Sequence, residues 1–174
     1  MKNDIEPMKN IAFIGLPGCG KTTVSKKVAA ALGRAWYDSD REIEAQSGMS
    51  IPRIFAERGE EYFRRLESQC IAGLFAKKPA VIALGGGAIL RNGSLIKENA
   101  VVIYLNRSAE SIIATLPADS RPLLACKAPA ETLAALQALY EQRRQLYEDL
   151  YDFKVDNEGS IEEAVKKVLA ALKI

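Results

Sequence analysis

The chain has 174 residues, of which 48% are hydrophobic, so it can bury one core without disulfides or a structural metal. Its 24 basic and 22 acidic residues are mixed along the chain and leave a net charge of +2, which argues against nucleic acid or an anionic membrane as a partner. The first ten residues contain no apolar segment of a signal peptide, and no later apolar run reaches the roughly 18 residues of a membrane span. We therefore expect a single cytoplasmic domain over residues 1–174 that binds small diffusible ligands.

Short apolar runs alternate with longer amphipathic patterns along the chain. The short runs predict strands at residues 10–16, 34–40, 80–85, 100–106 and 151–157. The longer patterns, several of them ended by Gly or Pro, predict helices at residues 21–33, 41–48, 50–59, 60–78, 108–116, 131–150 and 160–172. Apolar strands separated by helices indicate an α/β fold with a parallel sheet that helices cover on both faces.

Two further features complete the expected organisation. Ser160 and Glu163 are spaced as a capping box at the start of the last predicted helix. The stretch around Pro117, Pro122 and Pro129 is the one long irregular insert in this pattern. Inserts of this kind in compact domains are usually functional lids or disordered segments.

The cysteine and histidine content restricts the chemistry. Cys19, Cys70 and Cys126 are widely spaced and match neither a disulfide framework nor a zinc site. The chain has no histidine, which excludes His-ligated metals and imidazole catalysis. Any catalysis must therefore use carboxylates, Lys, Arg, backbone amides and a hard cation.

The segment "GLPGCGKT" matches the motif G-x-x-x-x-G-K-[ST] and lies between a predicted strand and a predicted helix, as this motif requires. Its backbone amides form an anion cradle at a helix N-terminus. Lys21 can reach the β- and γ-phosphates of a nucleotide, and the Thr22 hydroxyl can ligate magnesium. We predict that the nucleotide contacts Gly15, Gly18, Cys19, Gly20, Lys21, Thr22 and Thr23. A chance glycine-rich turn is the less favoured interpretation.

The segment "YDSD" supplies two carboxylates near the nucleotide motif. Asp38 and Asp40 are two residues apart at the end of a predicted strand, so both side chains can point to the same side. Open parallel sheets bind ligands at this carboxyl edge. One carboxylate could help to hold magnesium, and the other could orient or deprotonate an acceptor hydroxyl. Taken alone, these residues fit a structural role equally well, with Asp38 forming a turn and Asp40 capping the next helix.

The segment "AVIALGGGAIL" ends a predicted strand with Gly85, Gly86 and Gly87. Phosphate-binding proteins often have a metal-binding carboxylate on such a strand, and here there is only backbone. A sharp turn would need one glycine rather than three. The three glycines therefore indicate that another group approaches this backbone closely.

The run from "GLPGCGKT" to "EEYFRRLE" is similar to the N-terminal half of the shikimate kinases, and "VIALGGG", "SRPLL" and "RRQLY" continue the resemblance in the same order. The resemblance implies the P-loop kinase fold, with a five-stranded sheet in the order 2-3-1-4-5, a substrate-binding segment at about 40–78 and a mobile lid at about 115–129. It also implies that a monomer transfers the γ-phosphate of ATP to the 3-hydroxyl of shikimate, with Mg²⁺ as cofactor, in aromatic amino acid biosynthesis.

The resemblance assigns arginines to the carboxylate of the substrate. By the match to F-R-x-x-E, Arg64 binds this carboxylate and Glu67 holds the arginine in place, whereas Arg65 is expected on the solvated surface. The segment "RRQLY" matches the family pattern R-x-P-L-Y at Arg143. Because glutamine stands where proline is common, Arg144 stays an alternative.

The remaining acceptor contacts are also implied by the resemblance. In the resembling family, the equivalent of Asp40 binds the acceptor hydroxyl, and that of Asp38 serves the magnesium. The backbone at Gly85, Gly86 and Gly87 contacts the substrate, so a Cβ there would occupy the volume of the substrate.

The segment "PADSRPLL" resembles the lid of the family, with Arg121 as the residue that closes over the phosphates. Lys21, Arg121 and Mg²⁺ would then supply positive charge around the transferred phosphoryl group. Many family members carry a further arginine about two helical turns earlier, near the adenine, where this chain has Ala114. We therefore expect weaker or broader nucleotide use, and residues 155–160 could form the adenine-side loop.

Two other functions compete with this interpretation. The first is a related kinase for another polyol acid such as gluconate, and the joint presence of Arg64, the three glycines and Arg143 argues against it. The second is a nucleotide-binding domain without catalytic activity. The complete set of expected catalytic residues argues against that alternative.

Overall fold

Five parallel strands form one sheet in the computed structural model, which describes residues 9–77, 79–115 and 129–173. The order across the sheet is β2-β3-β1-β4-β5, and every pairing is parallel. The strands are β1 (Asn10–Ile14), β2 (Trp36–Asp38), β3 (Val81–Ala83), β4 (Ala100–Asn106) and β5 (Phe153–Asp156). The predicted parallel sheet and its strand order are confirmed.

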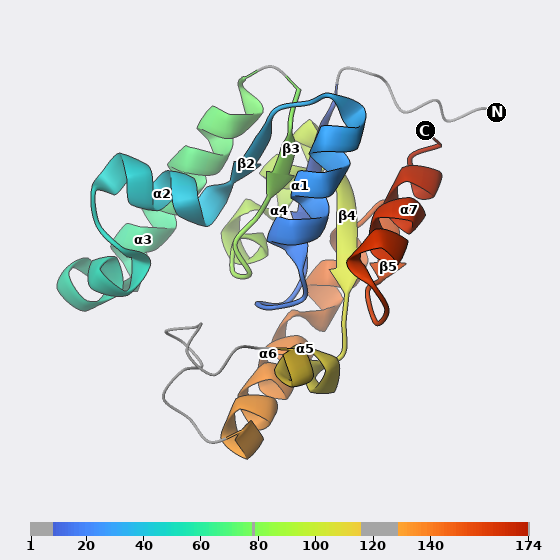
Figure 1. Cartoon of the computed structure of the whole chain (residues 1–174). Coiled ribbons are helices and arrows are strands. Elements are labelled where there is room, and N and C mark those ends of the chain that lie inside the picture. Colours follow the sequence, from blue (N-terminus) through green and yellow to red (C-terminus); the bar gives the residue numbers. More distant parts are fainter. Residues whose placement is uncertain (1–8, 78, 116–128, 174) are drawn as a thin grey trace.

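Helices cover both faces of the sheet, as predicted (Figure 1). In the described part of the chain they are α1 (Lys21–Leu32), α2 (Ser39–Ser47), α3 (Ile51–Phe75), α4 (Ile89–Asn99), α5 (Ala109–Thr115), α6 (Pro129–Leu150) and α7 (Ile161–Ala171). Helices α1 and α7 pack side by side on one face, and α4 lies on the other face in contact with α3 and α6. Helix α2 and the first part of α3 extend beyond the β2 edge.

The central strands are apolar throughout because both of their faces are covered. Ile11, Ile82 and Ile103, one from each of the three central strands, are at most 1% exposed. In the register of the sheet, Ile11 lies opposite Val81 on one side and Val101 on the other. This alignment brings the carboxyl ends of the strands to one edge of the sheet.

The loops that carry the predicted site residues meet at this edge, the lower one in Figure 1. The nucleotide motif, residues 15–22, follows β1 and is called the P-loop below. Asp38 ends β2, and Gly85, Gly86 and Gly87, called the glycine turn below, follow β3. Residues 106–108 end or follow β4, and Asn157 follows β5.

Helix α4 is an element that the sequence pattern did not predict. Asn92 and Gly93 interrupt its amphipathic pattern, and both are weak helix formers. The backbone of Asn92 departs from helical geometry, with φ −112° and ψ 15°. Its buried amide Nδ2 donates to the Ala88 carbonyl at 3.0 Å, so a local side-chain bond supports the distorted turn.

Two helices that were predicted separately, at 50–59 and 60–78, form the single kinked element α3. Gly59 makes the kink, with φ 79° and ψ 168°. The left-handed region at this φ is costly for a residue with a Cβ, so the glycine is required by the backbone conformation. The kink turns the first part of α3 away from the sheet (Figure 1).

The predicted lid at about 115–129 falls almost entirely on residues 116–128, outside the described part of the chain, and Arg121 and Cys126 lie there as well. Among the helices that the structure describes, none combines the length and the apolar character needed to cross a bilayer.

Two glycines of α3 should respond in opposite directions to alanine. Gly59→Ala is expected to lower the free energy of unfolding by about 1–2 kcal/mol, because φ 79° is strained for any residue with a Cβ. Gly73→Ala is expected to raise it by about 0.5–1 kcal/mol, since Gly73 lies inside the helix and a Cβ there meets no atom within 4 Å. Urea unfolding of the two variants measures the difference in the free energy of unfolding. Equal changes in both variants would contradict the strained backbone at Gly59.

Candidate active site

The P-loop surrounds the N-terminus of α1. Gly18 and Gly20 have φ values of 89° and 98°, so the chain turns in a way that other residues rarely allow. Lys21 is 9% exposed, and its Nζ donates to the carbonyl oxygens of Gly15 and Leu16, both at 2.9 Å. A buried ammonium group beside free helix amides forms a strong anion-binding site.

Cys19 and Thr23 contribute differently from the rest of the predicted nucleotide set. The Cys19 side chain is fully buried, and its Sγ lies 3.9 Å from Lys21 Nζ. Cys19 can therefore offer only backbone atoms to a nucleotide. Thr23 is exposed in the first turn of α1, and its amide donates to the Gly20 carbonyl at 3.1 Å.

Asp38 connects the P-loop to the start of α2. Its Oδ2 accepts a hydrogen bond from Thr22 Oγ1 at 2.8 Å, and its Oδ1 accepts from the amides of Asp40 and Arg41 at 3.2 and 3.4 Å. Asp38 is thus the N-cap of α2, and the alternative that gave this position to Asp40 is wrong. The strand argument for the two aspartates is also wrong, because β2 ends at Asp38 and Asp40 lies in the first turn of α2.

The pair of Thr22 and Asp38 fits a magnesium ion. Both offer hard oxygen donors, and the two oxygens lie 2.8 Å apart beside the P-loop. Mg²⁺ usually takes few ligands from the protein and completes its octahedral shell with phosphate oxygens and water. Two protein oxygens at a phosphate cradle match this requirement.

Asp40 packs against the glycine turn. A Cβ on Gly85 would contact its carboxylate, with Cγ at 3.1 Å, so the side chain uses the space that glycine leaves. The pKa of Asp40 is raised to about 6, mainly because the carboxyl is buried. The negative charge of Asp38 contributes to this rise, and the positive charge of Lys21 opposes it. Near neutral pH the carboxylate is therefore mostly ionised but more basic than usual, which suits a general base.

Arg64 approaches the glycine turn from α3. A Cβ on Gly87 would lie 2.5 Å from its Nη1, so the guanidinium also occupies space that glycine leaves. Its Nη1 donates to Glu67 Oε2 at 2.8 Å, and the Glu67 side chain is 1% exposed. Burial raises the pKa of Glu67, although the bond from Arg64 opposes the shift. Arg65, the next residue, is exposed.

The other edge of the Arg64 guanidinium holds a second carboxylate. Its Nε and Nη2 donate to Glu60 Oε1 at 3.3 and 3.2 Å. The Glu60 side chain is 63% exposed, in contrast to that of Glu67. One edge of the guanidinium is thus fixed by a buried partner, and the other is paired with a residue that can move into solvent.

The structure distinguishes between the two candidate arginines of α6. Arg143 Nη1 donates to the Gly86 carbonyl at 2.8 Å, and the residue is half-buried. Arg144 is exposed and lies near Glu148, whose pKa its charge helps to lower. Arg143, and not Arg144, is therefore brought to the glycine turn.

Ser39 is a site residue that the sequence pattern did not single out. Its side chain is fully buried, and its Oγ accepts a hydrogen bond from the Gly85 amide at 2.9 Å. Ser39 thereby joins the start of α2, which carries Asp40, to the glycine turn. Its position between two aspartates was the available signal. The expected strand order made β2 and β3 neighbours, but it did not indicate that the Ser39 hydroxyl accepts from Gly85.

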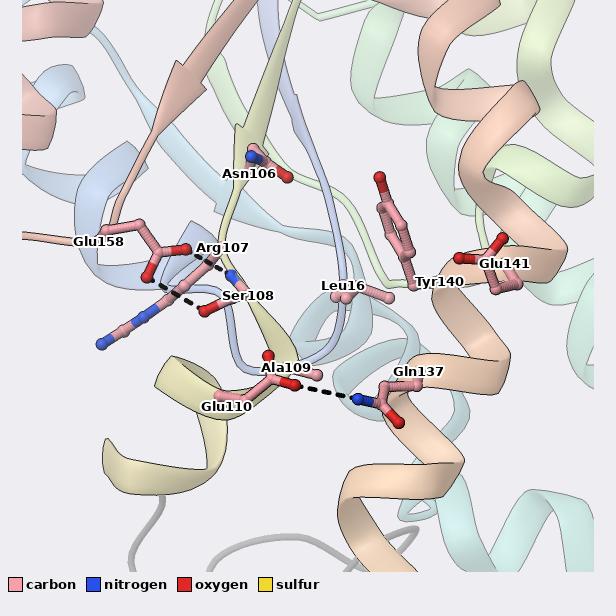
Figure 2. Close-up of a pocket in the computed structure, with 10 residues that line it drawn as sticks. All are labelled: Leu16, Asn106, Arg107, Ser108, Ala109, Glu110, Gln137, Tyr140, Glu141 and Glu158. Atoms are coloured by element: carbon pink, nitrogen blue, oxygen red, sulfur yellow. Dashed lines mark hydrogen bonds between the residues drawn. The ribbon is translucent and has the colours of Figure 1, made fainter.

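A pocket of about 580 Å³ adjoins the P-loop on the side of β4 (Figure 2). Leu16 of the P-loop, Tyr140 of α6 and Glu158 after β5 line it, together with residues 106–110. Glu158 accepts hydrogen bonds from the amide and the hydroxyl of Ser108 at 2.6 and 3.2 Å. The pocket lies between the ends of β1 and β4, where ligands bind in open α/β sheets.

This arrangement has close counterparts among known proteins. A family model described as shikimate kinase matches residues 17–173. The chain belongs to the shikimate kinase family. It is 40% identical over 173 residues to a shikimate kinase from Burkholderia lata, and the alignment covers 97% of the chain and 92% of the relative.

Solved structures agree with the family membership. The shikimate kinase from Acinetobacter baumannii in complex with shikimate superimposes with a TM-score of 0.86 at 35% identity, covering 95% of this chain and 93% of the other. A gluconokinase from Sinorhizobium meliloti matches with a TM-score of 0.63 at 17% identity over 95% of this chain and 91% of the other, which indicates a shared fold alone.

The raised pKa of Asp40 predicts a cost in stability at neutral pH. Between its ordinary value of 3.8 and about 6, this carboxyl is protonated in the fold and ionised in the unfolded chain. Its contribution to stability is therefore complete below about pH 4 and is lost as the pH rises through 6. Asp40→Asn, which mimics the protonated form, should raise the melting temperature at pH 7.5 by a few degrees and should not raise it at pH 4.

The measurement is thermal unfolding in EDTA, so that metal binding does not contribute. Asp149→Asn removes an exposed carboxylate of α6 and serves as the matched control, with the same small effect at both pH values. A gain in Asp40→Asn that is equal at pH 4 and pH 7.5 would contradict the raised pKa.

Proposed function

We propose that this chain transfers the γ-phosphoryl group of ATP to the 3-hydroxyl of shikimate, which yields shikimate 3-phosphate and ADP. The observation that carries the proposal is the close packing of Asp40 and Arg64 against one glycine turn, beside the P-loop. A general base and a carboxylate-binding arginine at one turn suit an acceptor that has both a hydroxyl and a carboxylate. Membership of the shikimate kinase family supports the choice of shikimate.

The nucleotide side of the reaction uses the P-loop. The amides at the start of α1 and the ammonium group of Lys21 bind the β- and γ-phosphates. Thr22 and Asp38 hold Mg²⁺, which neutralises charge on the phosphates when it is bound. The pocket between β4 and α6 has room for the nucleoside and adjoins the P-loop at Leu16.

The acceptor side positions the hydroxyl for attack. Asp40 takes the proton of the hydroxyl as its oxygen forms a bond to the γ-phosphorus. The bond from that phosphorus to the β–γ bridging oxygen breaks, and ADP leaves. Lys21, buried at the P-loop, stabilises the negative charge that collects on the leaving phosphate.

Arg64 and Arg143 bind the carboxylate of the acceptor. The Nε and Nη2 edge of Arg64 already holds a carboxylate, that of the exposed Glu60, and both nitrogens donate to its Oε1. A substrate carboxylate can displace Glu60 from this edge while Glu67 keeps the guanidinium in place. Arg143 adds a second positive charge at the glycine turn, where its Nη1 donates to the Gly86 carbonyl.

Arg121 is proposed as the cation of the lid, by its place in the motif alone. Phosphoryl transfer needs positive charge and the exclusion of water around the transferred group. An arginine supplied in this way is worth on the order of a thousandfold in rate. We also propose that the enzyme works as a monomer.

The proposal is tested by ADP release from ATP and Mg²⁺ with shikimate, with gluconate and with nucleoside monophosphates. Of these acceptors, only shikimate should support turnover of ATP. Asp40→Ala should abolish it. Arg64→Ala and Arg143→Ala should each lower kcat/KM for shikimate at least about thirtyfold, because a charge pair to the substrate is lost. Turnover with gluconate instead would assign the site to another polyol acid, and nucleotide binding without any turnover would indicate a non-catalytic domain.

Neighbouring arginines provide matched controls for this assay. Arg144→Ala removes an exposed charge from the same helix as Arg143, and Arg65→Ala does the same beside Arg64. Both controls should keep kcat/KM within about twofold of the unaltered enzyme, since surface charges contribute little. Equal losses in a variant and its control would contradict the assignment of the two substrate arginines.

The hydrogen bond from Gly85 to Ser39 predicts a specific defect in acceptor binding. Ser39→Ala frees the amide of the glycine turn and should raise KM for shikimate about three- to tenfold, with KM for ATP unchanged. Cys70→Ala is the matched control, because the buried Cys70 Sγ lies 3.8 Å from the backbone carbonyl of Ser39, whereas the bond from the glycine turn ends on the Ser39 hydroxyl. It should lower the melting temperature without changing either KM, and a similar KM change in both variants would refute the role of Ser39.

A further inference from the structure

Asn157 connects three segments of the chain at the nucleotide end of the site. It follows β5, and its backbone amide donates to the carbonyl of Asn106 at the end of β4, at 2.8 Å. Its side-chain Nδ2 donates to the carbonyl of Cys19 in the P-loop, at 2.7 Å. The residue is 1% exposed, so this contact is made away from water.

The contact determines which way one peptide group of the P-loop faces. Cys19 and Gly20 share a trans peptide, since the described chain contains no cis bond. In a trans peptide the C=O and the N–H point in opposite directions. Because Asn157 holds the Cys19 carbonyl, the Gly20 amide faces the other way, at the N-terminus of α1 where Gly20 is the N-cap.

The P-loop needs such a restraint. Gly20 has φ 98°, and glycine loses more conformational freedom on ordering than any other residue. A peptide flip at this position would turn a carbonyl oxygen toward the phosphates in place of an amide. A Cβ on Gly20 would lie 2.8 Å from Asn157 Nδ2, so a side chain there would displace the Asn157 amide group from its contact.

We infer that Asn157 is a positioning residue for the nucleotide, which holds the Cys19–Gly20 peptide so that its amide serves the phosphate cradle. The inference rests on the proposed use of ATP at the P-loop. It assigns Asn157 no contact with the reacting atoms.

Two observations separate this role from a purely structural one. The backbone amide of Asn157 already joins the chain after β5 to β4, so the side chain is not needed for that connection. The buried Oδ1 of Asn157 has no hydrogen-bond partner among the described residues. A buried polar group with one unpaired atom costs stability, which a purely structural position would avoid with an apolar residue.

The test compares Asn157→Ala and Asn157→Asp with the unaltered enzyme by two measurements. The first is hydrogen exchange of the P-loop amides without any ligand, and the second is the Kd for MgATP by calorimetry. Asn157→Ala should speed exchange in the P-loop and raise the Kd about three- to tenfold. Asn157→Asp should weaken binding further, because a carboxylate oxygen then faces the Cys19 carbonyl. KM for shikimate should stay unchanged in both.

Asn10→Ala is the matched control. Asn10 is also a buried asparagine, 5% exposed, and its side chain joins separate segments at the start of β1, far along the strand from the P-loop. It should lower the melting temperature at least as much as Asn157→Ala, with P-loop exchange and Kd unchanged. If Asn157→Ala does not fold, Asn157→Ser is measured in the same way, and any increase in exchange and Kd there supports the inference.

Each result decides the inference. A folded Asn157 variant with unchanged P-loop exchange overturns it, and so does an Asn10→Ala variant with the same change in Kd. If the unaltered enzyme bound no MgATP, the proposed function would fail, whereas P-loop exchange would still show whether Asn157 holds the loop.

Discussion

The buried ion pair between Arg64 and Glu67 determines the acceptor side of the site. Glu67 is 1% exposed, and a carboxylate at that depth requires a charged partner within hydrogen-bond distance. The guanidinium that meets this need lies against Gly87, so a side chain there would have to displace the guanidinium. The same turn accepts Asp40 at Gly85. Gly85 and Gly87 are thus explained by the two charged side chains that pack on them, before any ligand is considered. Gly86 is explained by Pro17, whose Cγ would lie 3.0 Å from a Cβ there.

The nucleotide side of the site has the opposite construction. There the backbone amides form the anion-binding group, and side chains hold the backbone in its conformation. Lys21 donates to carbonyls of its own loop, and Asn157 holds the Cys19 carbonyl from a segment 138 positions away in the sequence. Backbone amides can bind phosphate irrespective of which acceptor is present, whereas the arginines at the glycine turn suit a carboxylate.

Local patterns were sufficient for most of the fold and for part of the site. Apolar runs predicted the parallel sheet, because its central strands are buried on both faces. The P-loop was predicted from the spacing of its residues within one short segment, residues 15–22. Local patterns do not show which distant segments of the chain contact one another. Ser39 contacts Gly85, and Asn157 contacts Cys19. Neither contact could be predicted from the sequence around these residues. Helix α4 was not predicted because its amphipathic pattern is interrupted at Asn92, where the backbone also departs from helical geometry.

The contact between Arg64 and Glu60 bears on how the proposed acceptor would enter. If a substrate carboxylate replaces that of Glu60, as we propose, one anion is exchanged for another at the same guanidinium, and the sum of charges around Arg64 stays the same. The guanidinium is never left bare, so the exchange avoids most of the cost of stripping water from a free cation. Ionic strength should then influence acceptor binding less than two arginines in one site would suggest.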